Sequence, residues 1–174
     1  DALTGGEIGR PNTGTFRLID MVGLDTTLSV ANYQLKNVTD PAEQVFLALP
    51  DFFAQMQKKG YLGDKTKQGF YCKLDKELQV IDVATLTYRA KTEPDFPSLA
   101  SVKAAKTLRE KLALWLAAED KAGRFVWDVL KQTLLFVGGL IPTVADDPKA
   151  IDNGMKWGYN WTVGPFELWD MIGV

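Results

Sequence analysis

The segment Thr162–Val174, TVGPFELWDMIGV, is an imperfect copy of an earlier segment, Thr13–Leu24, TGTFRLIDMVGL. The identical residues keep one constant offset, which pairs Gly14, Phe16, Leu18, Asp20, Met21 and Gly23 with Gly164, Phe166, Leu168, Asp170, Met171 and Gly173. Two unrelated helix starts could share glycine, phenylalanine and leucine, but they would not readily preserve this order. We therefore interpret the chain as an internal duplication.

The residues around both copies show the spacing that is typical of helices, so we predict a mostly α fold. Asp25 is placed to accept a backbone N–H as an N-cap. The run Ala122–Ile141 is apolar around much of its circumference and is expected in the middle of a packed bundle, ending before Pro142. Helices are predicted over Asp25–Asn37, Pro41–Leu49, Asp51–Gly60, Val102–Glu119, Ala122–Ile141, Pro148–Gly158 and Pro165–Gly173.

One stretch departs from the helical pattern. FYCKL at Phe70–Leu74 and LQVIDVATLTYRA at Leu78–Ala90 are rich in aromatic and β-branched residues and flank a polar turn. These runs predict one small β-hairpin. The following KTEPDFPS, Lys91–Ser98, carries two prolines and is expected to be a surface linker.

Composition excludes several classes of protein. A formal net charge of -2 and 46% apolar residues argue against a nucleic-acid-binding surface and against disorder. The single cysteine, Cys72, cannot form an internal disulfide, so we expect a reducing, cytoplasmic compartment. No run reaches the roughly 20 apolar residues that a transmembrane helix needs. Both ends of the sequence are interpreted as cut points within a longer protein.

Two motifs carry a resemblance to a known family. GPFELWDMIG, Gly164–Gly173, resembles the GPFEL-D-x-x-G phrase in the C-terminal domain of L-3-hydroxyacyl-CoA dehydrogenases. The loop GYLGDKTKQGFY, Gly60–Tyr71, is similar to the G-x-G-x-K-T-x-x-G-F-Y phrase that closes the same domain. The resemblance implies helical repeats like the C-terminal domain of 6-phosphogluconate dehydrogenase. Two tandem copies are typical of multifunctional members that are fused to an enoyl-CoA hydratase.

This resemblance divides the chain into three parts. Residues 1–75 are expected to be the remainder of a first C-terminal repeat, 76–97 the hairpin and linker, and 98–174 a truncated, degenerate second repeat. AGRFVWDVL, Ala122–Leu130, resembles a family segment in which an asparagine and an arginine lie at the active cleft, but this chain has Trp127 and Asp128 there. The second copy is therefore expected to serve packing alone.

The implied function is that of a fragment of an NAD-dependent L-3-hydroxyacyl-CoA dehydrogenase of fatty-acid β-oxidation, which oxidises 3-hydroxyacyl-CoA to 3-oxoacyl-CoA. In the family the base is a histidine on the nucleotide-binding domain, whereas this sequence has no histidine. GGEIG, Gly5–Gly9, lacks the GxGxxG spacing of a dinucleotide loop. We therefore predict no catalytic residue here, an NAD bound mainly by another, N-terminal domain, and no turnover by the fragment alone.

Lys65 is the one predicted cofactor-binding residue, because it matches the lysine of the family's K-T phrase, which reaches toward NAD. A point charge suits pyrophosphate or ribose contacts. The alternative is an exposed loop lysine beside Lys67. Asp146, Asp147 and Asp152 lack the ligand spacing of a calcium loop, so helix capping is the better explanation and no metal site is predicted.

Two other functions stay open. A stand-alone helical interaction or dimerisation module would lack catalysis, but it should end in polar caps rather than in apolar runs. A short-chain hydroxybutyryl-CoA enzyme would belong to the same superfamily, but a single-copy enzyme should end soon after Tyr71.

Overall fold

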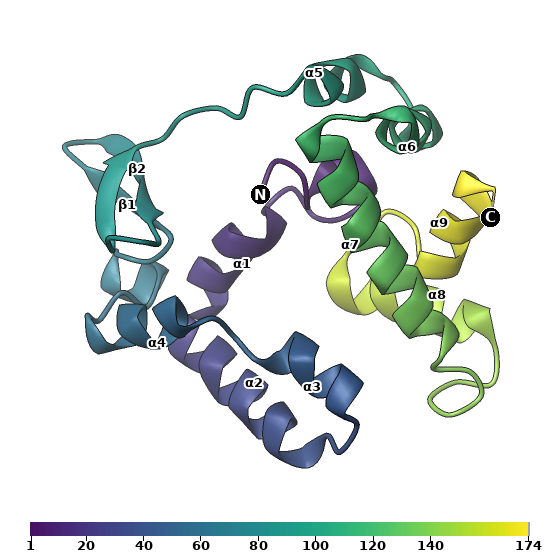
Figure 1. Cartoon of the computed structure of the whole chain (residues 1–174), viewed down its shortest axis with the longest axis horizontal. Helices are drawn as coiled ribbons and strands as arrows, with labels where there is room; N and C mark the ends of the chain where they lie inside the picture. Colours follow the sequence, from purple (N-terminus) through teal and green to yellow (C-terminus); the bar gives the residue numbers. More distant parts are fainter. Residues whose placement is uncertain (174) are drawn as a thin grey trace. The chain divides into compact units, whose positions relative to one another are not determined.

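The computed structural model describes residues 1–173 and, within them, every side chain except that of residue 42. The predicted mostly α architecture is confirmed (Figure 1). The α-helices are α1 (Gly14–Val22), α2 (Leu24–Asn37), α3 (Pro41–Leu47), α4 (Asp51–Lys58), α5 (Pro97–Ala104), α6 (Leu108–Ala117), α7 (Lys121–Gly138), α8 (Pro148–Tyr159) and α9 (Pro165–Ile172). Two short 3-10 helices, η1 (Gly6–Ile8) and η2 (Asp64–Thr66), complete the helical elements of this part of the chain.

The chain folds as two compact units. The split unit combines Asp1–Gly14 with Pro94–Val174, and the inserted unit comprises Thr15–Glu93. The predicted division into a first repeat at 1–75, a hairpin and linker at 76–97 and a second repeat at 98–174 stays a prediction. No helix in residues 1–173 combines the length and apolar character that spanning a membrane requires.

The core of the split unit is organised around α7. Asp120 caps this helix by accepting the Gly123 N–H at 2.9 Å, and Val126, Leu130 and Leu134 form its buried stripe. Residues packed with this stripe include Ile8, Leu99, Val102, Leu112, Trp115 and Leu168. The predicted central position of this helix is therefore confirmed, although it ends at Gly138, because two consecutive glycines are poor helix formers.

The first residues of the chain are fastened to this core by polar contacts. The indole Nε1 of Trp115 donates to the carbonyl of Glu7 at 3.2 Å, and the Thr162 N–H donates to the carbonyl of Gly9 at 2.9 Å. The guanidinium of Arg10 lies 4.6 Å from the Trp161 ring centroid. These contacts explain why Asp1–Gly14 folds with the second half of the sequence.

The predicted single helix over Val102–Glu119 is wrong, because the chain breaks it into α5 and α6. The Thr107 hydroxyl accepts the Glu110 N–H at 3.2 Å, and a Glu110 carboxylate oxygen accepts the Thr107 N–H at 3.0 Å. This capping box starts a new helix at Leu108.

The inserted unit contains a three-stranded antiparallel sheet, one strand more than the predicted hairpin, in the order β1 (Tyr71–Leu74), β2 (Glu77–Asp82) and β3 (Thr87–Ala90). The extra strand arises because an oxygen of the Asp82 carboxylate accepts the N–H groups of Ala84 and Thr85 at 2.9 and 3.1 Å. This side-chain turn folds the long apolar run back on itself. The sheet and α2 and α4 share a core of Leu24, Leu28, Phe53, Met56, Phe70, Ile81 and Leu86.

The two sequence copies adopt similar local structures, although the first glycine has a φ of 66° in one copy, at Gly14, and of -75° in the other, at Gly164. Each forms a helix, α1 and α9, that ends at a glycine with positive φ: Gly23 at 104° and Gly173 at 74°. An aspartate also lies against the first glycine of each copy, Asp1 against Gly14 and Asp152 against Gly164, where a Cβ would come within 2.6 and 2.3 Å of that aspartate's atoms. The environments differ further along, because Asp20 is buried whereas Asp170 is exposed.

Candidate functional site

The best-defined polar site of the inserted unit is the corner between α1 and α2, on which the loop Gly60–Tyr71 closes. Leu24 at the start of α2 donates its N–H to the carbonyl of Leu62 at 3.1 Å. Gly23 forms the corner with a φ of 104°, a region that side-chain-bearing residues rarely adopt. A Cβ there would also lie 3.0 Å from the Lys65 Nζ and 2.9 Å from an Asp25 carboxylate oxygen. The backbone of the corner therefore favours glycine, and a Cβ there would displace the ends of the Lys65 and Asp25 side chains.

The loop is anchored by a buried carboxylate. Asp20, only 2% exposed, accepts the backbone N–H groups of Phe70 and Tyr71, each at 2.8 Å. Burial raises the pKa of Asp20, and the two amide hydrogen bonds oppose that rise. Gly63 and Gly69 pack so closely on this aspartate that a Cβ would lie 2.3 Å from its carbonyl oxygen and 2.1 Å from its carboxylate, respectively. The glycines of the loop thus allow the close approach.

The short helix η2 is held by a hydroxyl inside the loop. The Thr66 Oγ1 accepts the Leu62 N–H at 3.0 Å and lies 2.9 Å from the carbonyl oxygen of Gln68, to which it can donate. Lys67 follows with a φ of 58° and ends the turn. This conformation fixes the direction in which Lys65 leaves the backbone.

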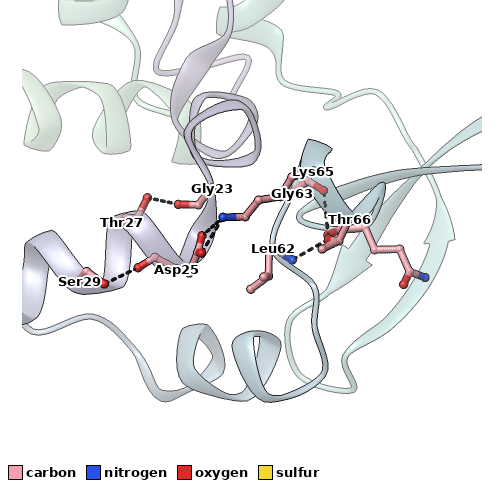
Figure 2. A network of polar contacts seen from close by, with 9 residues as sticks. Gly23, Asp25, Thr27, Ser29, Leu62, Gly63, Lys65 and Thr66 are labelled. Atoms are coloured by element: carbon pink, nitrogen blue, oxygen red, sulfur yellow. Dashed lines mark hydrogen bonds and ion pairs between the residues drawn. The ribbon is translucent and has the colours of Figure 1, made fainter.

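Lys65 extends from η2 to the first turn of α2 and forms an ion pair with Asp25 there (Figure 2). Its Nζ lies 2.5 Å from Oδ1 and 2.6 Å from Oδ2 of Asp25. The side chains are 46% and 37% exposed, so solvent reaches both partners. The contact with Lys65 lowers the pKa of Asp25, which stays ionised at neutral pH.

The predicted N-cap role of Asp25 is wrong. The helix begins one residue earlier, after Gly23, which makes no side-chain capping bond, so Asp25 lies in the first turn. Its carboxylate binds Lys65, a contact between residues 40 positions apart that helix patterns cannot reveal.

A second ion pair holds the neighbouring loop residue. The Arg17 guanidinium binds both oxygens of Asp64 at 2.5 and 2.8 Å, with side chains 41% and 52% exposed. This contact lowers the pKa of Asp64 and raises that of Arg17. Consecutive loop residues are therefore tied to α1 and to α2.

The other candidate residues lie in the split unit. Trp127 is half-buried on α7, and Asp128 is exposed and 3.3 Å from the Lys131 Nζ. Asp147 caps α8 by accepting the Ala150 N–H at 3.0 Å, which confirms its capping role.

The contacts of Asp152 reach further along the chain than the predicted capping of a nearby helix. It is 5% exposed and accepts the N–H groups of Phe166 and Glu167, at the start of α9, at 2.7 and 3.2 Å. Asp146 is exposed. Among residues 1–173, no three acidic or thiol side chains gather in a way that could hold a metal ion.

Comparisons with known proteins agree with the motifs of this loop. Residues 1–73 match the family model described as 3-hydroxyacyl-CoA dehydrogenase, C-terminal domain. A probable 3-hydroxyacyl-CoA dehydrogenase of Bacillus subtilis (strain 168) is 44% identical over 177 residues, which cover 100% of this chain and 22% of the relative. A putative fatty acid oxidation complex trifunctional enzyme of Rickettsia felis is 27% identical over 92% of this chain and 22% of its own length.

A probable 3-hydroxyacyl-CoA dehydrogenase of Deinococcus radiodurans is 42% identical over 44% of this chain and 21% of its own length. No solved structure matches the chain significantly. The chain thus spans about a fifth of the length of the relatives that it matches. The family prediction made from the two sequence phrases is confirmed.

Proposed function

Since residues 1–73 belong to the family of 3-hydroxyacyl-CoA dehydrogenase C-terminal domains, we propose that the chain works as part of a longer NAD-dependent L-3-hydroxyacyl-CoA dehydrogenase. The reaction is the oxidation of 3-hydroxyacyl-CoA to 3-oxoacyl-CoA in fatty-acid β-oxidation. The observation that carries this proposal is the 44% identity to the Bacillus subtilis relative over the whole chain, which a stand-alone interaction module would not require.

The oxidation needs a hydride acceptor, which NAD supplies when bound, and a base for the hydroxyl proton. The 174 residues include no histidine, so we place the base on another part of the longer protein. The contribution of this chain is then to shape the helical side of the site and to present the loop Gly60–Tyr71. Lys65 fits an auxiliary cofactor contact, because its ammonium is half-exposed and has three donors, of which Asp25 engages at most two.

The wider setting extends the same proposal. The Rickettsia felis relative is named a trifunctional enzyme, which supports a multifunctional protein carrying an enoyl-CoA hydratase beside the dehydrogenase. A single, buried and unpaired cysteine, Cys72, supports the cytoplasm as its compartment. Acyl-CoA and NAD are the proposed small-molecule partners.

The test replaces Lys65 by alanine in the full-length enzyme. Loss of a charge-assisted hydrogen bond costs about 1.5–3 kcal/mol, or roughly ten- to a hundredfold in affinity, and exposure of the ammonium favours the lower limit. We expect Lys65→Ala to raise the KM for NAD about tenfold while kcat at saturating NAD changes little, as expected for uniform binding.

Lys67→Ala, two positions along the same loop, is the control and should behave like the parent. Equal NAD binding by both variants, or a fall in kcat alone for Lys65→Ala, would contradict the assignment of Lys65 as a cofactor contact.

A further inference from the structure

The ion pair between Lys65 and Asp25 restricts the kinds of ligand group that the corner between α1 and α2 can bind. An ammonium has three donors and a carboxylate has about four acceptor positions. The two contacts at 2.5 and 2.6 Å engage at most two N–H groups of Lys65 and one acceptor position on each oxygen of Asp25. Both side chains remain partly exposed. The pair therefore presents a donor and an acceptor side by side to solvent.

The corner is also electrically balanced. Lys65 is neutralised by Asp25, and Arg17 is neutralised by Asp64 on the adjacent residue of the same loop. Protein sites that hold phosphate groups usually combine uncompensated cations with free backbone N–H groups. A phosphate at this corner would meet the Asp25 carboxylate as a second anion.

Four backbone donors at the corner are used by the fold itself. The N–H of Leu24 binds the Leu62 carbonyl, and that of Thr27 binds the Gly23 carbonyl. In the loop, the N–H groups of Gly63 and Thr66 bind Gln68 and Gly63 carbonyls, respectively. These four amides are thus not free to bind a phosphate.

We propose that Lys65 and Asp25 together bind a ribose hydroxyl of the dinucleotide, with Lys65 donating a hydrogen bond to the hydroxyl oxygen and Asp25 accepting one from the hydroxyl. A hydroxyl both donates and accepts, so it complements the adjacent donor and acceptor without breaking the ion pair. The proposal rests on the proposed function and adds Asp25 as a second ligand-binding residue. Gly23 supports the pair, because any Cβ at this position would crowd both Lys65 and Asp25.

The experiment measures equilibrium binding of NADH to the full-length enzyme by fluorescence, which does not depend on turnover. Asp25→Asn keeps the size of the side chain but removes its charge and half of its acceptor oxygens. We expect the dissociation constant of NADH to rise about five- to tenfold, comparable with Lys65→Ala. A phosphate clamp predicts the opposite sign, since removing Asp25 would free the Lys65 ammonium and tighten binding.

Competition by two probes separates the ligand groups. ADP-ribose carries the hydroxyls, and inorganic pyrophosphate carries only the phosphates. We expect Lys65→Ala and Asp25→Asn to weaken competition by ADP-ribose and to leave competition by pyrophosphate within about twofold. Weaker competition by pyrophosphate would overturn the hydroxyl assignment.

Asp64→Asn is the matched control, because it breaks the neighbouring ion pair on the same loop without touching Lys65. It should change the NADH dissociation constant by less than about twofold. An effect as large as that of Asp25→Asn would mean that loosening the loop explains both results, and the proposal would fail. If Lys65→Ala itself leaves NADH binding unchanged, the cofactor contact of the proposed function fails as well.

Discussion

Replacement of Asp20 by asparagine tests how strongly one buried carboxylate holds the candidate site together. In the native protein both carboxylate oxygens accept a backbone N–H, from Phe70 and from Tyr71. Asparagine retains one acceptor oxygen, but it turns an amide donor toward the second N–H. A buried donor left without its acceptor costs about 1–3 kcal/mol. Asp20→Asn should therefore destabilise the inserted unit by this amount.

Amide hydrogen exchange gives this prediction a local readout. A loss of about 1–3 kcal/mol corresponds to roughly five- to a hundredfold faster exchange if the loop opens with the same free energy. We expect this acceleration at the amides of Phe70 and Tyr71. Asp170→Asn is a matched control within the same chain, because Asp170 is the exposed counterpart of Asp20 in the second sequence copy. It should stay within about 0.5 kcal/mol of the parent. Equal effects of the two substitutions would refute the anchoring role of Asp20.

Further predictions concern the split unit. Gly164→Ala should lower the melting temperature, since its Cβ would lie 2.3 Å from Asp152 and overpacking costs about 1–3 kcal/mol. In Gly154→Ala, within α8, the new Cβ would meet no atom within 4 Å, so this substitution should stabilise the protein by about 0.5–1 kcal/mol. Thermal unfolding of both variants checks that the two effects have opposite signs. Hydrogen bonds from the N–H groups of Gly123 and Ser98 lower the pKa of Asp120 from 3.8, so its contribution to stability is complete above that value and is lost as the pH falls through the lower folded pKa. In urea unfolding from about pH 5 to pH 2, the free energy of unfolding of Asp120→Asn should fall less steeply with acidification than that of the parent. An unchanged pH profile would contradict this assignment.

Local sequence patterns predicted many of the helices and caps of the fold but few of its long-range contacts. The glycine–proline start of α9, the apolar stripe of α7 and the Asp147 cap are encoded within a few residues of one another, and each was predictable. The break between α5 and α6 was also visible in principle, since Thr107 and Glu110 have capping-box spacing, but the apolar periodicity that continues past it favoured one helix.

The candidate site depends on contacts that local patterns do not encode. The bond from Phe70 to Asp20 joins residues 50 positions apart, and the ion pair of Lys65 with Asp25 joins residues 40 positions apart. The sequence phrase around Lys65 identified the loop through its family resemblance. It did not identify Asp25 as the partner, because an aspartate in the first turn of a helix has a sufficient local explanation as a cap or a dipole partner.

The inserted position of Thr15–Glu93 has a consequence for the order in which the protein folds on the ribosome. Chains are synthesised from the N-terminus at about 5–20 residues per second, and domains generally fold as units. The inserted unit is complete before most of the split unit has been made. Ile8, 1% exposed in the finished protein, must wait for α6, α7 and α9 to emerge before it is covered. Within this chain, Asp1–Gly14 is thus made before the inserted unit but buried after it, and during that interval it is open to chaperones and proteases.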